Sequence, residues 1–248
     1  MSKLSTSLKI YIYLGLLLAA SNAIQVLSPS FQSLLPTTSL PAPLPVIALA
    51  NAGIAIVLYG GLGFIGLKLA GKLGFADIWG PEVSNRQRLL IPGVIGVALG
   101  IFLIVSDIIF SQFNGIGRLP HPSFPASIFA SLSAGIGEEI IFRLFFIPIW
   151  VWLISSVILR GKWRNQVFWT VTLISALVFA LGHLPSLMIL LNYKSLSEIS
   201  PMFFLEIILL NGVISIFAAY YMRKYGFLTA VGIHFWTDIV WHVIWGLF

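Results

Sequence analysis

Two adjacent glutamates and an arginine, Glu138, Glu139 and Arg143, lie inside the apolar run 126–159. That run is long enough to cross a bilayer, where ionisable groups are costly and usually functional. On a helix, Glu139 and Arg143 are i,i+4 neighbours on one face, whereas Glu138 points about 100° away. Arg143 can neutralise Glu139 and leave Glu138 as a general base or metal ligand. The alternative is a structural ion pair between helices, which two adjacent glutamates make less favoured.

Two later apolar runs carry histidines. His183 ends one run, a turn after Phe179. His234 and Asp238 are i,i+4, so the carboxyl group can orient the imidazole and fix its tautomer. Each histidine alone is more often a hydrogen-bonding partner in a helix bundle than a catalyst. Together with Glu138 they supply a base, two imidazoles and a second acid, as water activation and oxyanion stabilisation at a peptide carbonyl require.

The composition fixes the class of protein. Hydrophobic residues make up 58% of the chain and charged residues 9%, whereas soluble domains are about a quarter charged. The chain has no cysteine, which excludes disulfides, thiolate catalysis and cysteine-type zinc sites. The net charge of +6 comes from short basic flanks between apolar runs, which indicates membrane orientation rather than nucleic-acid binding.

The apolar runs predict an all-α, polytopic transmembrane helical bundle of about seven spans. Pro148 is expected to kink or divide the fourth span. Residues 1–125 would hold N-terminal transmembrane helices and an interfacial segment, and residues 126–248 a catalytic core. The expected spans, the first a retained anchor helix, are 6–27, 46–67, 89–110, 126–159, 166–184, 201–222 and 227–248.

Basic residues predict the orientation of this bundle. Eleven of the 14 basic residues fall in loops on one side of the predicted bundle. The other side has only Arg118 and Lys194, and Arg143 lies within the membrane. This bias places the N-terminus in the cytoplasm and the C-terminus outside. The residues on the cytoplasmic side are Lys3, Lys9, Lys68, Lys72, Arg86, Arg88, Arg160, Lys162, Arg164, Arg223 and Lys224.

Other isolated polar residues receive simpler interpretations. Asp107 ends the third span and is expected at the interface, and His121, between two prolines, is expected to be a solvated loop residue. Glu206 and Asn211 on the sixth span are expected to form interhelical hydrogen bonds. His242 either extends the polar face of the last span or lies near the outer interface.

The three motifs resemble the CPBP family. Glu-Glu-x-x-x-Arg at 138–143, Phe-x-x-x-His at 179–183 and His-x-x-x-Asp at 234–238 occur in that order on successive membrane helices. The family comprises type II CAAX prenyl endopeptidases and bacteriocin-processing or immunity proteins. The resemblance covers the chain from residue 126 to the C-terminus, and the first three spans match only as generic additions.

The resemblance implies roles for these residues. Glu138 and His183 would hold and activate the hydrolytic water, and His234 with Asp238 would support the oxyanion. Glu139 and Arg143 would be structural partners. Family endopeptidases usually carry Asn where this chain has Asp238. An ionised Asp cannot donate a hydrogen bond to an oxyanion, so Asp238 would be protonated, orient His234 or bind a metal.

Metal dependence stays open at this point. Glu138, His183 and His234 could form a zinc site of the two-histidine, one-carboxylate type with an open water position. The chain has no His-Glu-x-x-His helix, and a metal-free glutamate mechanism is slightly favoured.

We therefore expect an intramembrane endopeptidase of a bacterial plasma membrane. Its partners would be membrane lipid and a membrane-associated substrate, either a peptide or a lipidated protein of the CAAX, bacteriocin or pheromone-precursor type, and no nucleic acid. Two other classes remain. One is a non-proteolytic immunity or scaffold protein, and the other is a proton-coupled transporter, for which the chain shows no inverted repeat.

Overall fold

The computed structural model describes residues 5–29, 40 and 42–248, and every regular element in that part of the chain is helical. Seven helices are long and apolar enough to cross a membrane. The all-α polytopic bundle is therefore confirmed, and the chain is a multi-pass membrane protein. The spans are α1 (Thr6–Leu27), α3 (Leu44–Ile54) with α4 (Gly60–Lys72), α5 (Ile91–Phe110), α6 (Ala126–Glu138) with α7 (Ile147–Val151), α8 (Arg164–Gly182) with α9 (Leu184–Leu190), α10 (Pro201–Tyr225), and α11 (Phe227–Asp238) with its extension to Leu247.

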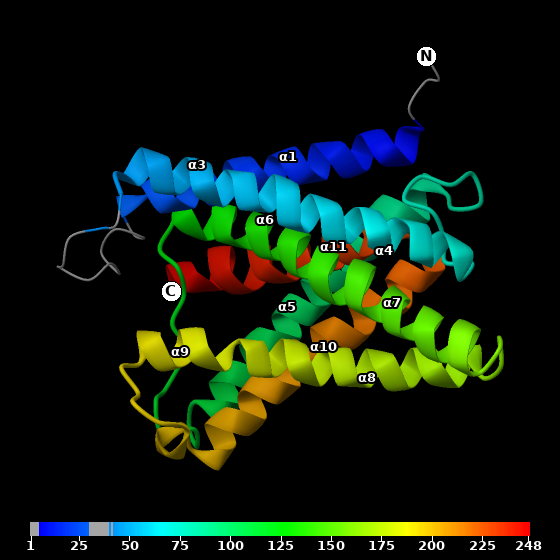
Figure 1. The fold of residues 1–248 in the computed structure, drawn as a ribbon. Helices are drawn as coiled ribbons and strands as arrows, with labels where there is room; N and C mark the ends of the chain where they lie inside the picture. The colour runs from blue at the N-terminus through cyan, green and yellow to red at the C-terminus, as the bar shows by residue number, and fades with distance from the viewer. Residues whose placement is uncertain (1–4, 30–39, 41) are drawn as a thin grey trace.

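The last span, which begins with α11, lies at the centre of the bundle. It packs against α5, α6 and α10, and 56% of its membrane-spanning window is buried, against 17% for the span of α3 and α4. Figure 1 shows α1 and α3 along one side of α6, with α8 on the other. Because α6 and α11 are in contact, the Glu-Glu motif and the His-x-x-x-Asp motif meet inside the bundle.

Glycines on α5 fix the position of α11. A Cβ atom on Gly96 would lie 2.7 Å from the carbonyl oxygen of Ile233, and one on Gly100 would lie 3.0 Å from that of Thr237. The Thr237 hydroxyl also donates a hydrogen bond to the Gly96 carbonyl at 3.2 Å. Small residues four positions apart let membrane helices approach this closely. The height and rotation of α11 therefore depend on α5.

The fourth span is continuous from Ala126 to Ile158. Its irregularity is a π-helical segment, Glu139–Phe146, that joins α6 to α7. The hydroxyl of Ser175 on α8 donates a hydrogen bond to the Phe142 carbonyl within this segment, at 3.2 Å. Pro148 lies two residues after the π-helical segment, in the first turn of α7. The span is therefore not divided at Pro148, and a kink there stays a prediction.

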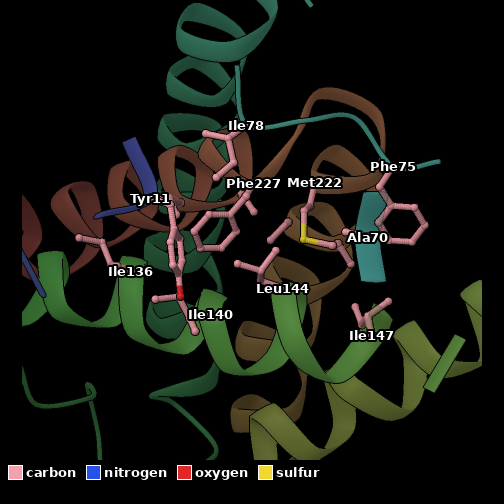
Figure 2. Close-up of a cluster of buried hydrophobic side chains, with 14 of the residues drawn as sticks. Tyr11, Ala70, Phe75, Ile78, Ile136, Ile140, Leu144, Ile147, Met222 and Phe227 are labelled. Atoms are coloured by element: carbon pink, nitrogen blue, oxygen red, sulfur yellow. The ribbon is translucent and has the colours of Figure 1, made fainter. Parts of the chain in front are cut away.

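One face of the fourth span is anchored in a large apolar cluster, shown in Figure 2. Ile136, Ile140, Leu144 and Ile147 recur at helical spacing and are 0–1% exposed, so they form a continuous apolar stripe. This anchoring leaves the charged residues of the span facing other helices. The stripe packs into a cluster with Tyr11, Ala70, Phe75, Ile78, Met222 and Phe227.

Candidate active site

Glu139 and Arg143 form a fully buried ion pair. The Arg143 Nη1 atom lies 3.3 Å from Glu139 Oε1, and both side chains are 0% exposed. The Arg143 guanidinium also lies over the ring of Phe179, 4.1 Å from its centroid. A buried charge pair survives only with such compensation, because desolvation of either ion alone is expensive. The pairing expected from the i,i+4 spacing is present in the structure.

Glu139 also orients His234. The Nδ1 atom of His234 lies 2.8 Å from Glu139 Oε1, the oxygen that faces Arg143. Because a carboxylate paired with a guanidinium accepts hydrogen bonds, Nδ1 carries the proton and donates it to this contact. The proton on His234 Nδ1 is thus held by Glu139, the first residue of the π-helical segment after α6, across 95 positions of sequence.

Two further carboxyl groups flank the other nitrogen of His234. The Nε2 atom lies 3.8 Å from Glu138 Oε2 and 3.7 Å from Asp238 Oδ2. Both distances exceed those of a hydrogen bond, so Asp238 does not orient the ring as the i,i+4 spacing suggested. Glu138, Asp238 and Nε2 instead surround one small space.

Glu138 differs from Glu139 in its exposure. Its side chain is 35% exposed, whereas that of Glu139 is 0% exposed. The Oε2 atoms of both glutamates are buried and accept no hydrogen bond from the described residues, so the partial exposure of Glu138 is what distinguishes the two. A partly exposed carboxyl group that lines a cavity is available to a water molecule or a substrate. The two adjacent glutamates therefore have separate environments, one structural and one open.

His183 joins the site from the junction of α8 and α9. Its Nδ1 atom lies 2.8 Å from the carbonyl oxygen of Phe179, one turn earlier. A carbonyl only accepts hydrogen bonds, so Nδ1 carries the proton and Nε2 keeps its lone pair. The Phe179 ring packs edge-on against both His183 and His234. Phe179 thus serves as the spacer between the two imidazoles.

These side chains line one cavity of about 220 Å³. Its polar side is formed by Glu138, His183, His234, Asp238 and His242. The cavity also has an apolar wall contributed by α5, α9, α10, the π-helical extension of α11 and the loop before α6. The wall contains Leu103, Leu119, Leu187, Ile207, Leu210, Ile214 and Trp241.

The loop 111–125 covers part of this cavity. Some of the residues that hold the loop in place make contacts other than those expected from the sequence. Asp107 is fully buried, and its Oδ1 atom accepts a hydrogen bond from the Leu119 amide at 2.9 Å, so it holds the loop in place. Glu206 accepts from the Asn114 side chain at 2.8 Å and also interacts with the side chain of Asp107. Glu206 therefore ties α10 both to the loop and to α5, as the interhelical bond expected from the sequence requires. The Asn114-Gly115 pair is a turn signal that the sequence already contained.

His121 and Asn211 also differ from expectation. The Nδ1 atoms of His121 and His242 lie 3.1 Å apart, and the His121 ring packs edge-on against Trp241. His121 is therefore not a solvated loop residue, and His242 lies at the cavity. Asn211 donates a hydrogen bond to the carbonyl of Ile207 in its own helix, at 2.9 Å, and no interhelical bond of Asn211 is found within the described part of the chain.

The donors of the proposed zinc set do not form a metal site in this arrangement. Among the described residues, no group of three His, Asp or Glu side chains is placed to hold a metal ion. Both nitrogens of His234 face carboxyl groups and Nδ1 of His183 faces a carbonyl. Glu138, His183 and His234 therefore line one cavity without converging on one point.

Residues 120–240 match the family model described as type II CAAX prenyl endopeptidase, Rce1-like. This segment belongs to the CPBP family. The CPBP segment contains all three motifs and every polar residue of the cavity except His242. The description of the matched model is that of a CAAX-type endopeptidase, so the family suggests a protease. Searches of curated proteins and of solved structures returned no match.

Proposed function

We propose that the chain is an intramembrane endopeptidase that hydrolyses a peptide bond with a water molecule activated by Glu138. The observation that carries this proposal is that Glu138, His183 and His234, from three different spans, line the same cavity. Each histidine has its Nδ1 atom in a hydrogen bond, which leaves its Nε2 atom to act in the cavity.

In the proposed reaction, Glu138 takes a proton from water while Nε2 of His183 accepts the second hydrogen bond of that water. The hydroxide attacks the carbonyl carbon, and the negative charge moves to the carbonyl oxygen. For this step His234 acts in its imidazolium form, in which Nδ1 still donates to Glu139 and Nε2 donates to the oxyanion. Glu138 then returns its proton to the leaving amine as the C–N bond breaks.

The cavity also supports a class of substrate. Its catalytic groups face an apolar wall of leucine, isoleucine and tryptophan side chains. Such a wall accommodates a hydrocarbon chain or an apolar side chain next to the scissile bond. We therefore propose a membrane-anchored peptide or a prenylated CAAX-type protein as substrate, cleaved in the membrane in which the enzyme is embedded.

The proposal is tested with the full chain in liposomes. Prenylated CAAX-type peptides are incubated with the wild type, with Glu138→Gln and with Glu82→Gln, which removes an exposed glutamate outside the cavity. New peptide termini are expected with the wild type and Glu82→Gln and are expected to vanish with Glu138→Gln. Comparison of membrane-peptide termini from cells expressing the same variants extends the test to native substrates. Unimpaired cleavage by Glu138→Gln would refute the mechanism.

A further inference from the structure

A second hollow, of about 260 Å³, is also lined by Glu138. Unlike the catalytic cavity, it is lined by the N-terminal helices. Asn22 and Gln25 come from α1, and Tyr59 comes from the π-helical turn before α4. These three residues precede the segment 120–240 that matches the CPBP family.

The two hollows meet along one face of α6. Ala130, Ala134 and Glu138 line both of them, and their spacing of four residues places them in a row on the helix. Because the first two are alanines, the row presents little bulk between the hollows. A chain in extended conformation can therefore cross α6 here, with its crossing point at Glu138.

The polar side chains of the second hollow can bind a polar occupant. Among the described residues the Asn22 amide has no hydrogen-bond partner, and Asn22 lies near the end of the membrane-spanning helix α1. Gln25 is held in place, because its Nε2 atom donates to Ser133 Oγ at 2.6 Å and to the Phe129 carbonyl at 3.2 Å. Polar groups at membrane depth are costly without hydrogen bonds. The hollow is thus built for a partner that carries its own donors and acceptors.

Tyr59 and Glu138 lie side by side in the lining of this hollow. A Cβ atom on Gly137 would lie 3.2 Å from Tyr59 Cε1, so glycine at this position lets the ring lie against α6. Tyr59 also interacts electrostatically with Glu138. The polar hollow therefore reaches the same carboxyl group that faces His234 in the catalytic cavity.

We propose that this hollow is the binding subsite for the peptide portion of the substrate. Backbone amide and carbonyl groups on one side of the scissile bond bind Asn22, Gln25 and Ser133, while the apolar anchor on the other side occupies the catalytic cavity. The substrate crosses α6 along the row of Ala130, Ala134 and Glu138, with the scissile bond next to Glu138. This inference rests on the proposed endopeptidase function and adds that the N-terminal helices select the peptide portion.

The first test separates binding from chemistry. Asn22→Leu is compared with Asn51→Leu, which changes an asparagine that bonds only to its own helix at the Ile47 carbonyl and does not line the hollow. For a prenylated CAAX-type peptide, Asn22→Leu is expected to raise KM about tenfold with kcat nearly unchanged, as loss of one or two hydrogen bonds implies. Asn51→Leu is expected to match the wild type. A fall in kcat alone would show that the hollow delivers water, which would overturn the inference.

The second test does not depend on cleavage. A pool of fluorescent prenylated peptides with varied C-terminal residues is bound to Glu138→Gln in liposomes, with and without Asn22→Leu. Binding that weakens about tenfold with Asn22→Leu supports the subsite even if the wild type cleaves nothing, in which case only the proposed function fails. Binding that is absent from the pool, or indifferent to Asn22, overturns the subsite. Ala130→Leu, which fills the row between the hollows, is expected to weaken binding in the same assay.

Discussion

The Nδ1 atom of His234 lies 2.8 Å from Glu139 Oε1, and this contact joins the two most important spans of the site inside the membrane. The same oxygen faces Arg143. The Oε1 atom of Glu139 therefore pairs with Arg143 and accepts the hydrogen bond of His234 Nδ1. Its neighbour Glu138 takes part in neither contact.

Replacement of Glu139 by leucine is expected to destabilise the fold by about 3–5 kcal/mol, because it leaves the Arg143 guanidinium buried without its partner. Thermal unfolding in detergent measures this effect. The double variant Glu139→Leu/Arg143→Met is expected to recover most of the stability, since no charge then remains unpaired. Peptide cleavage is expected to stay low in both, because His234 loses its orienting contact. Recovery of full activity in the double variant would contradict this role of Glu139.

Replacement of Asp238 by asparagine is expected to preserve most of the peptide cleavage. Asp238 makes no hydrogen bond with His234 in the structure, since their closest atoms are 3.7 Å apart, and an amide could donate directly to an oxyanion. Asp238→Leu removes the polar group that lies 3.7 Å from His234 Nε2 and is expected to lower kcat by about 10²-fold, because His234 is then less well placed to donate to the oxyanion. Steady-state kinetics on both variants provides the comparison. Equal and severe losses would assign Asp238 a role that requires its charge.

A methyl group added at Gly96, where α5 packs closely against α11, is expected to destabilise the fold. Gly96→Ala would place Cβ 2.6 Å from Trp236 Cβ and 2.7 Å from the Ile233 carbonyl oxygen, at an expected cost of about 1–3 kcal/mol. Gly93→Ala is the matched control, because its Cβ would meet only Trp236 atoms at 3.7 Å. Unfolding midpoints in detergent should separate the two variants. Equal midpoints would mean that the helices adjust freely.

The loop over the cavity is expected to loosen at mildly acidic pH. Burial lowers the pKa of His121 from its usual 6.5, against the opposing effect of Asp107. The unfolded chain then binds the proton more readily than the folded chain, so the free energy of unfolding falls as pH drops below about 6.5. Proteolysis of the loop at pH 8 and pH 5.5 measures the effect. His121→Gln is expected to remove part of this pH dependence. If the variant shows the same pH dependence as the wild type, another titrating group causes it.

The transmembrane architecture was largely readable from the sequence. Apolar runs and their basic flanks predict seven spans because the bilayer imposes both length and polarity on each helix. The second and fifth spans run past their expected ends, to Lys72 rather than to residue 67 and to Leu190 rather than to residue 184. The fifth does so because α9 follows α8 directly after His183. The orientation of the termini and the roles of the individual site residues stay predictions.

Other features of the site depend on contacts between distant segments, and spacing within one helix did not reveal them. The i,i+4 rule correctly paired Glu139 with Arg143, yet it gave Asp238 the orienting role that Glu139 has across helices. Likewise, the N-terminal spans appeared generic, although Asn22 and Tyr59 line a hollow at Glu138. Such convergence is determined by helix packing, which local periodicity does not encode.

The π-helical segment from Glu139 to Phe146 makes the site sensitive to chain length. A π-helix bonds residue i to i+5, so each of its turns holds more residues than an α-helical turn. Loss of a single residue between positions 140 and 142 would let an ordinary α-helix form through the segment. The two glutamates would then rotate by about 100° relative to Arg143 and to the apolar stripe beyond it. In homologous chains, a one-residue gap at this point would therefore mark proteins that keep the bundle but have dismantled the site.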